Sequence, residues 1–512
     1  MTQNPSTAPT YRTHRQILVI LGGLMTGMFL AALDQSIVGT ALPRITSELH
    51  GLNKLSWVVT AYLLASTAAT PLWGKISDLY GRRLIFQAAI ITFLIGSALC
   101  GFARNIDELI AFRALQGIGG GGLMALALAT IGDVVPPRER GRYMGYMGAV
   151  FGTASVLGPV LGGWLADGPG WEWIFWLNVP IGIVALVVTS IVLKLPHVRR
   201  EHTIDWLGAG FLVAAVSSVL LYTAWAGPDH GWADGLSLSL LIGGLVLAAI
   251  FVLIERRAAE PILPMDLFNN SVFSITNALG MVFGISMFGA IIFVPLYLQI
   301  VMGMSPTRSG LGMVPMVAGL FSASIPSGNY VTKTGRYRMF PIASTIIVAC
   351  ALLLLSTLDA DSSYLRVGIG MYVLGFGLGL TMQLLTLIVQ NSVDVRHMGV
   401  ATSTVTFFRN LGGAFGTAVF GAVLNSRLSH HLEVSLGSAP AGGSINTNNA
   451  AAIHNLPEPV RGKVIDAFAS SLHEVFLTAL PFVGVAFILT LFIKELPLRS
   501  RNTPVPATAT EP

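Results

Sequence analysis

Residues 74–83 read GKISDLYGRR, and this polar stretch joins two apolar runs, 56–76 and 83–103. A helix crosses the roughly 30 Å hydrocarbon core of a bilayer in about 20 apolar residues, so each run predicts a membrane span. Similar runs recur along the whole chain. The predicted spans are 17–42, 56–76, 83–103, 107–132, 144–166, 174–194, 207–226, 236–255, 271–301, 308–328, 339–357, 364–390, 399–425 and 475–493. The pattern therefore predicts an all-α membrane protein with fourteen transmembrane helices.

The composition agrees with a membrane protein. Only 11% of the 512 residues are charged, 53% are hydrophobic, and the mean hydropathy is +0.70. Such a chain has too little charge to cover a soluble surface, which excludes a cytosolic enzyme, a nucleic-acid-binding protein and a coiled coil. Cys100 and Cys350 lie in apolar runs and predict no disulfide. The first apolar run is too long for a cleaved signal peptide, so we expect it to be a true span.

The loop charges predict the orientation. Twenty of the 30 lysines and arginines lie on the side of the N-terminus, and only five lie in the short loops of the opposite side. Positively charged loops remain in the cytoplasm. We therefore expect both tails, 1–16 and 495–512, on the cytoplasmic side of a bacterial plasma membrane. The long polar loop 426–474 would lie outside, and the net charge of +5 needs no nucleic-acid partner to explain it.

Two glycine patterns occur twice. GKISDLYGRR has a weaker copy from Gly328 to Arg336, and Gly141, Gly158 and Gly163 recur as glycines at 399, 416 and 421. These repeats predict two related six-helix bundles, 17–194 and 271–494, with two inserted helices and their linkers in 195–270. Parallel repeats of this kind are typical of transporters whose halves rock about a central site.

Five stretches of sequence carry a family resemblance: GKISDLYGRR, LIAFRALQG at 109–117, GPVLGG at 158–163, LDQSIVGTALP at 33–43 and WIFWLNVP at 173–180. Together they resemble the major facilitator superfamily, and in detail its fourteen-span drug/proton antiporter branch. The resemblance covers the whole chain and implies the major facilitator fold. Three positions depart from the family pattern: Gly39 replaces a usual asparagine, Ala154 the first glycine of the antiporter motif, and Thr332 an acidic residue in the second signature loop.

Asp34 and Arg113 are ionisable residues deep inside predicted spans. They lie about 12 Å and about 9 Å from the same membrane face, so the two could face each other or alternate partners. Charge inside the hydrocarbon is costly, which makes each residue a functional candidate. A carboxylate that moves between an arginine and a drier environment can take up and release a proton. A static ion pair is the alternative, and the resemblance implies the proton-coupling role.

The signature loop and the end of the fourth span carry a second set of charges. We expect Asp78 and Asp133 to hold Arg82 at the cytoplasmic ends of the helices, with Gly74 and Gly81 allowing a tight turn. Ordinary flanking charges are the alternative, and the resemblance implies a conformational latch.

The fifth span contains the motif of Gly158, Pro159, Gly162 and Gly163. Its glycines leave a smooth face for close helix approach, and its proline bends the helix. Packing alone explains the glycines. The resemblance implies in addition an exporter that seals against proton leak.

A substrate pocket is expected near the middle of the spans. Its candidate residues, for each of which a core role is the alternative, are Gln35, Tyr62, Gln116, Tyr297, Gln383 and Arg409. Arg409 could contact an anionic substrate group, Asp34, or backbone carbonyls. No metal site is expected, because His430 and His431 stand without further ligands in the outer loop. The pattern Gly117-x-Gly119-x-x-Gly122 lacks the preceding strand that a dinucleotide site requires.

These inferences predict a proton-coupled antiporter rather than an enzyme. It would export amphipathic, cationic or neutral drug-like compounds by alternating access and so confer antibiotic resistance. Its expected partners are those compounds, protons and the lipid bilayer, with the proton gradient as energy source and no cofactor. The alternatives are an exporter of one endogenous metabolite, lipid, siderophore or antibiotic, an uptake symporter, and a non-transporting sensor. Whether a periplasmic adaptor takes part stays open.

Overall fold

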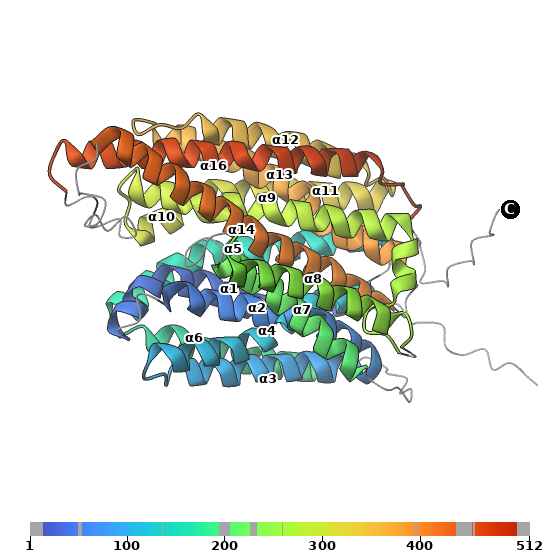
Figure 1. Ribbon diagram of the computed structural model, residues 1–512. Helices are drawn as coiled ribbons and strands as arrows, with labels where there is room; N and C mark the ends of the chain where they lie inside the picture. The colour runs from blue at the N-terminus through green and yellow to red at the C-terminus, as the bar shows by residue number, and fades with distance from the viewer. Residues whose placement is uncertain are drawn as a thin grey trace, which may run out of the picture.

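The computed structural model describes residues 14–49, 54–135, 137–193, 205–225, 233–258, 260–394, 397–436, 453 and 456–498. Most of the predicted tails and the middle of segment 426–474 lie outside these residues. The described part of the chain forms a bundle of long helices and contains no strand (Figure 1). The helices are α1 (His14–Glu48), α2 (Leu55–Tyr80), α3 (Arg82–Cys100), α4 (Ile106–Val134), α5 (Pro137–Asp167), α6 (Glu172–Val192), α7 (Trp206–Trp225), α8 (Gly235–Glu255), the short η2 (Met265–Asn269), α9 (Ser271–Ile300), α10 (Pro306–Gly312), α11 (Val314–Thr334), α12 (Met339–Ser356), α13 (Tyr364–Ser392), α14 (Met398–Leu436) and α16 (Val460–Leu491).

The helices pack as two groups with the same internal order. In the first group α1 lies against α5 and α6, while α2 and α3 lie against α4. In the second group α9 lies against α14 and α16, while α11 and α12 lie against α13. The groups form the lower and upper layers of Figure 1. We call them the N-terminal half (α1–α6) and the C-terminal half (α9–α16), and their shared order agrees with the glycine repeats.

The first helix begins and the last helix ends on the same side of the bundle. We call this side, where α1 begins and α16 ends, the termini end, and the opposite side the distal end (Figure 1). Below, the depth of a residue along the helices is given relative to these two ends.

Glycines allow α4 to pack closely between α2 and α3. A Cβ atom on Gly121 would overlap the carbonyl oxygen of Ser66 in α2, and one on Gly119 would overlap the backbone of Phe93 in α3. Small residues permit this approach of two helix backbones inside a membrane. The glycine-rich pattern at 117–122 therefore serves helix packing.

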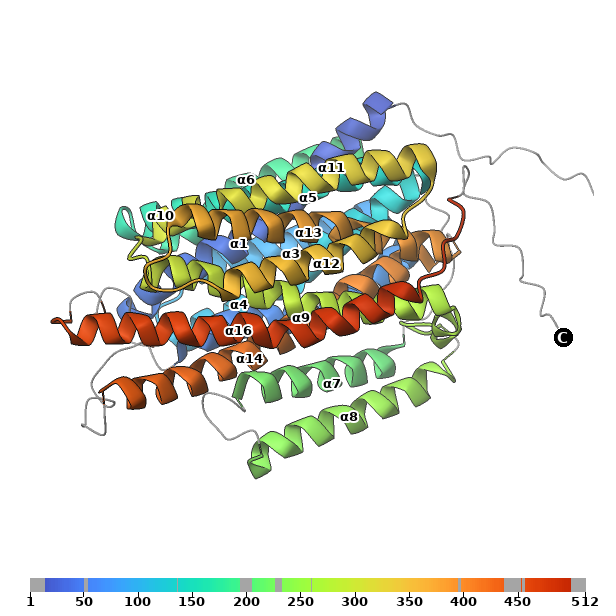
Figure 2. The same cartoon turned by 90° about the horizontal axis from the view of Figure 1, so that it is seen from above.

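Helices α7 and α8 form a pair at the edge of the bundle (Figure 2). α8 packs on α7, and α7 packs on α2 and α14, one helix from each half. Lys75 of α2 forms an ion pair of 2.8 Å with Glu260 in the segment that follows α8. Glu255 is a buried carboxylate that sequence analysis did not single out. It accepts hydrogen bonds from the backbone N–H groups of residues 262 and 263, which fixes the turn leading toward α9.

Twelve helices among the described residues are long and apolar enough to cross a membrane. α2 and α9 are not among the twelve, although at 26 and 30 residues they have the length of a span. Fourteen spans therefore remain a prediction.

The predicted extent of the outer loop, 426–474, was wrong. α14 continues to Leu436 and α16 already begins at Val460. Hydropathy locates the apolar part of a helix only, and here the helices continue as polar segments. Glu474 connects the two extensions, because it pairs with Arg427 at 2.8 Å and with His431 at 3.0 Å.

The predicted span 308–328 falls within one candidate membrane span, Thr307–Thr334, as expected. It is divided into α10 and α11, with Met313 between them. Pro315 stands in the first turn of α11, where its missing N–H group is tolerated and cannot extend the preceding helix.

Candidate functional site

The centre of the N-terminal half contains a buried ion pair between α1 and α4. The Arg113 Nη1 atom lies 2.6 Å from Asp34 Oδ2, and the two side chains are 2% and 0% exposed. The similar depths estimated from the sequence are thus explained by direct contact. Removing one partner of such a pair leaves a buried charge without compensation, which is strongly unfavourable.

Two amide side chains complete the surroundings of Asp34. Gln116 Nε2 and Asn178 Nδ2 donate hydrogen bonds to Asp34 Oδ1 at 2.8 and 2.9 Å. Gln116 also accepts a bond of 2.7 Å from Arg113 through its Oε1 atom. Gln116, expected in the substrate pocket, is therefore a member of the ion-pair network. Its position one helical turn after Arg113 places both side chains on the same face of α4.

Asn178 and Ser97 were not predicted as site residues. Asn178 also donates to Ser97 Oγ at 3.0 Å, and Ser97 donates to the backbone oxygen of Phe175 at 2.9 Å. Both side chains are fully buried. Asn178 lies inside the stretch WIFWLNVP that carried the family resemblance, so the sequence did contain a signal for it. Ser97 stood in an apolar run without any such signal.

Aromatic rings cover the guanidinium of Arg113. Its Cζ atom lies 4.3 Å from the centre of the Tyr62 ring and 5.9 Å from that of Phe175. A cation over an aromatic face is stabilised by the ring's electron distribution, most strongly where water is excluded. Tyr62, predicted for the substrate pocket, thus borders the ion pair directly.

The antiporter motif in α5 lies against α1 beside Asp34. A Cβ atom on Gly158 would overlap the Ser36 side chain, and one on Gly162 would lie 2.8 Å from the Ile37 oxygen. Ser36 also donates a hydrogen bond of 2.8 Å to the oxygen of Ala154. α1 and α5 are therefore in contact at Ala154 as well, although the sequence departs from the family motif at this position.

The other two motif residues face the C-terminal half. A Cβ atom on Gly310 of α10 would overlap Pro159, and one on Gly163 would lie 2.9 Å from Thr307 Oγ1 of α10. The motif thus connects the helix that carries Asp34 to the interface between the halves.

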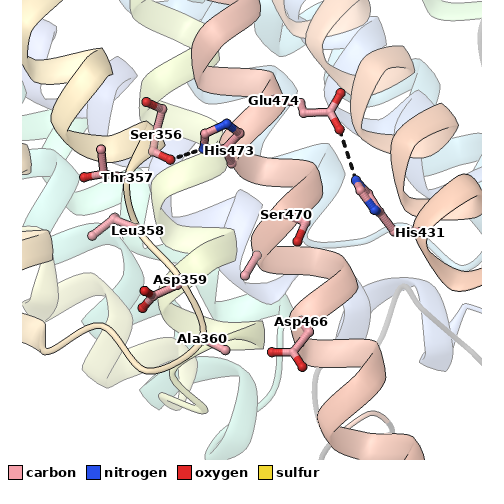
Figure 3. A pocket seen from close by; sticks show the side chains of 11 residues that line it. Ser356, Thr357, Leu358, Asp359, Ala360, His431, Asp466, Ser470, His473 and Glu474 are labelled. Atoms are coloured by element: carbon pink, nitrogen blue, oxygen red, sulfur yellow. Dashed lines mark hydrogen bonds and ion pairs between the residues drawn. The ribbon is translucent and has the colours of Figure 1, made fainter. Parts of the chain in front are cut away.

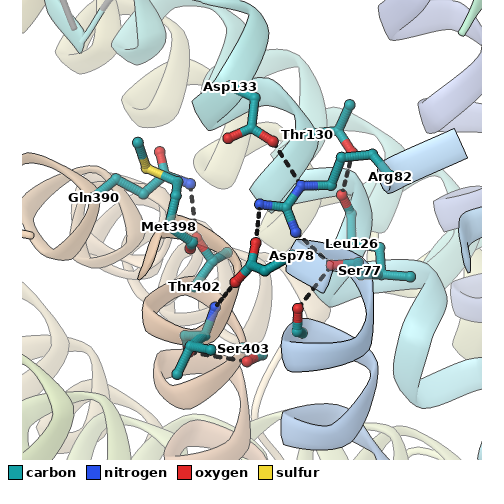
Figure 4. Close-up of polar contacts among 12 residues, drawn as sticks. Ser77, Asp78, Arg82, Leu126, Thr130, Asp133, Gln390, Met398, Thr402 and Ser403 are labelled. Atoms are coloured by element: carbon teal, nitrogen blue, oxygen red, sulfur yellow. Dashed lines mark hydrogen bonds and ion pairs between the residues drawn. The ribbon is translucent and has the colours of Figure 1, made fainter. Parts of the chain in front are cut away.

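A second charged cluster lies at the termini end, where α2, α3, α4 and α14 meet (Figure 4). Arg82 pairs with Asp78 at 2.5 Å and with Asp133 at 2.6 Å. Asp78 Oδ2 in turn accepts a hydrogen bond of 3.0 Å from the backbone N–H of Val400 in α14. The three predicted charges therefore come together, and one of them binds the opposite half directly.

The expectation that Gly74 and Gly81 both form a turn was half wrong. Gly81 has a φ of 94° and separates α2 from α3, as a turn requires. Gly74 lies within α2, where a Cβ atom would overlap the Ser403 side chain of α14. Gly74 therefore allows close contact between the halves. The motif spacing could not distinguish a turn glycine from a contact glycine.

A further hydrogen bond joins the halves beside this cluster. Gln390 Nε2 of α13 donates to Leu128 O of α4 and to Thr402 Oγ1 of α14, both at 3.0 Å (Figure 4 shows the bond to Thr402). Together with the Asp78–Val400 bond, it closes the termini end of the interface.

Of the remaining candidates for the substrate pocket, three lie within the bundle and Tyr297 lies at the distal end. Gln35 is half-buried, Gln383 and Arg409 are buried, and the Gln383 Oε1 atom has no hydrogen-bond partner in the described part of the chain. Tyr297 was wrongly expected near the middle. Its hydroxyl donates a bond of 2.6 Å to the backbone oxygen of Asp359 at the distal end, because α9 is long enough to carry residue 297 there.

The distal end also contains a polar cavity of about 530 Å³ between the loop after α12 and the helices α14 and α16 (Figure 3). His431 and Glu474 line this cavity and form a hydrogen bond with each other. His473 Nδ1 contacts the backbone oxygen of Ser356. His431 is thus a paired residue on α14 and not the solvated loop residue expected. No group of three or more metal-binding side chains occurs among the described residues.

Two helix groups of the same internal order, meeting around buried charges, define a membrane transporter. Residues 24–417 match the Major Facilitator Superfamily. The chain belongs to this family, and it is a transporter and not an enzyme.

The relatives agree on this class. The chain is 42% identical over 504 residues to an uncharacterized MFS-type transporter of Mycobacterium tuberculosis, covering 96% of this chain and 73% of the relative. It is 39% identical to the multidrug transporter protein MdtP of Bacillus subtilis over 510 residues, covering 94% of each chain. Among solved structures it resembles the human organic anion transporter MFSD10, with a TM-score of 0.62 at 16% identity, covering 91% of this chain and 99% of the other. This last likeness shows the fold alone.

Proposed function

We propose that this protein is a proton-coupled exporter of amphipathic, drug-like compounds in a bacterial plasma membrane. The observation that carries the proposal is the buried Asp34–Arg113 pair, in which a carboxylate with three polar partners lies among apolar helices. Ionisable groups are retained in such places when they serve ion or substrate movement. The multidrug name of a relative that is 39% identical supports the substrate class.

Protonation of Asp34 would change what holds α1 to α4. The neutral carboxyl group loses its charge attraction to Arg113, while Gln116 and the Tyr62 ring remain beside the guanidinium. The proton thereby loosens α1 relative to α4. α5 would pass the change to the interface between the halves, because its motif contacts α1 on one side and α10 on the other.

The termini end would face the cytoplasm, as the loop charges predict. In that orientation the structure represents a state closed to the cytoplasm, held by the Asp78–Val400 and Gln390–Leu128 bonds. Loading a compound from the cytoplasm requires these bonds to break, and release requires them to form again. This alternation is the proposed transport cycle, driven by the proton gradient without a cofactor.

The proposal includes fourteen spans. α2 would complete the membrane part of the N-terminal half and α9 that of the C-terminal half, with α7 and α8 as the inserted pair. Exchange of outward-moving drugs for inward-moving protons would give resistance to antibiotics.

The test is proton-driven uptake of a fluorescent cationic dye into inside-out membrane vesicles with an imposed pH gradient. Asp34→Asn should abolish the proton-dependent part of uptake, because an amide cannot carry the proton. Asp107→Asn is the matched control, since the Asp107 side chain is 70% exposed and pairs with Lys54 at the surface. Equal amounts of protein with the same melting temperature establish that each variant is folded. Undiminished proton-driven uptake by Asp34→Asn would refute the proposal.

A further inference from the structure

Arg409 is unusual among the buried cations of the described residues. Lys75, Arg82 and Arg113 each form an ion pair, and Arg140 donates to backbone oxygens. Arg409 is 6% exposed, and within the described part of the chain it has no hydrogen bond or ion pair. A buried charge without a partner is strongly unfavourable, which makes Arg409 a candidate for binding an anion.

Arg409 lies on the face of α14 that carries Thr402, a residue at the interface between the halves. Thr402 of the same helix accepts the hydrogen bond from Gln390, which also binds α4 of the opposite half. Residues seven apart lie two turns apart on one helix face. Arg409 therefore lies on the same face of α14 as Thr402, about 10 Å further toward the distal end. Its backbone packs against Gly284 of α9.

Gln383 lies at the same depth on the facing helix. α13 runs opposite to α14, and Gln383 stands seven residues before Gln390, as Arg409 stands seven residues after Thr402. Its Oε1 atom is buried without a hydrogen-bond partner in the described chain, and so are the hydroxyl groups of Thr381 and Thr386. Groups of this kind are satisfied in proteins by a ligand or by water. The C-terminal half thus presents one cation and several polar atoms at one level.

The N-terminal half contributes Tyr62 at this level. A Cβ atom on Gly120, eight residues distal of Leu128 on α4, would overlap the Tyr62 hydroxyl group. This hydroxyl is buried, and the ring of Tyr62 covers Arg113. Buried polar groups of both halves therefore lie at a depth similar to that of Arg409, and Tyr62 is beside the proton site.

We propose that Arg409, together with Gln383, binds an acidic group of the transported compound. The preferred substrates are then amphipathic molecules that carry a carboxylate or a similar anion, including zwitterions, and not only the cationic or neutral compounds that the sequence suggested. A guanidinium binds a carboxylate through two parallel hydrogen bonds, which gives both affinity and orientation. This inference rests on the proposed function, because only an exporter would carry such a compound across the membrane. Binding of the compound can be measured independently of transport.

A matched pair of probes tests the inference: a rhodamine with a free carboxylate and its methyl ester. Equilibrium binding to the full-length purified protein is followed by fluorescence polarisation. The wild type should bind the carboxylate form more tightly than the ester. Arg409→Gln should weaken binding of the carboxylate form at least tenfold, leave the ester within about twofold, and Arg409→Lys should recover part of the loss.

Arg427→Gln is the matched control, because Arg427 lies on the same helix with a 52% exposed side chain at the distal end. It should bind both probes as the wild type does. Equal weakening of both probes by Arg409→Gln, or no preference of the wild type for the carboxylate, would overturn the inference and make Arg409 a packing residue. If Arg409→Gln is unfolded by thermal melting, the comparison is made with Arg409→Lys and Gln383→Leu, both of which should weaken only the carboxylate form. Failure of proton-driven transport with both probes in the wild type would refute the proposed function and leave the binding result intact.

Discussion

Replacing Gly399 by alanine should open the termini end of the interface. Gly399 is buried at the start of α14, and a Cβ atom there would overlap the carboxylate of Asp78 and the guanidinium of Arg82. The neighbouring backbone N–H of Val400 donates to Asp78 at 3.0 Å, so displacing the carboxylate breaks the bond that joins the halves. A hydrogen bond to a charged group contributes about 1.5–3 kcal/mol. Its loss should shift the equilibrium between closed and open states about 10- to 150-fold toward the open state.

The shift can be measured as a distance between spin labels on the two halves. Arg83 at the start of α3 and Met339 at the start of α12 are both exposed at the termini end. Each is replaced by cysteine in a chain without Cys100 and Cys350, and double electron–electron resonance gives the distance distribution. Gly399→Ala should move population to longer distances. Gly243→Ala is the control, because a Cβ atom there meets nothing within 4 Å. An unchanged distribution in Gly399→Ala would refute the role of the Asp78–Val400 bond.

Three other variants test the site. Asn178→Leu removes one of the three polar contacts of Asp34 and should lower proton-driven dye uptake about tenfold, whereas uptake at the wild-type rate would show that Asn178 only packs. Gly162→Val should separate α5 from α1 and lower the melting temperature by several degrees, and a melting curve like that of the wild type would contradict the close contact with Ile37. Lys75→Met removes the ion pair with Glu260 and should cost about 1 kcal/mol or less, because Glu260 is partly exposed. Urea unfolding measures this cost, and a loss of several kcal/mol would contradict it.

The positions of twelve spans and the depths of residues within them could be predicted, because both depend on local composition. Counting residues from a span end placed Asp34 and Arg113 at similar depths, and the structure brings them within 2.6 Å. The charges of the signature loop were also found, since motif residues at the ends of neighbouring spans must meet near the same surface.

Side-chain partners could not be predicted, because they depend on how helices rotate and how far they extend. Gln116 was identified as a polar residue near the middle, yet only the rotation of α4 decides that it binds Asp34. Tyr297 was misplaced because the length of α9 brings it to the distal end. Ser97 gave no signal, since a single serine in an apolar run is common in membrane helices that pack closely.

The ion pair also determines the electrical character of the proposed cycle. Asp34 and Arg113 belong to the same half and sum to zero charge while Asp34 is ionised. Rocking of the halves in this state moves no net charge from the pair through the membrane field. Once Asp34 is protonated, Arg113 carries one positive charge, and moving a full charge across 100 mV involves about 2.3 kcal/mol. Through this pair the membrane potential would therefore act on the proton-loaded step, whereas Arg409 carries its charge in both steps. A voltage jump should accordingly alter the rate of the proton-loaded step more strongly than that of the return.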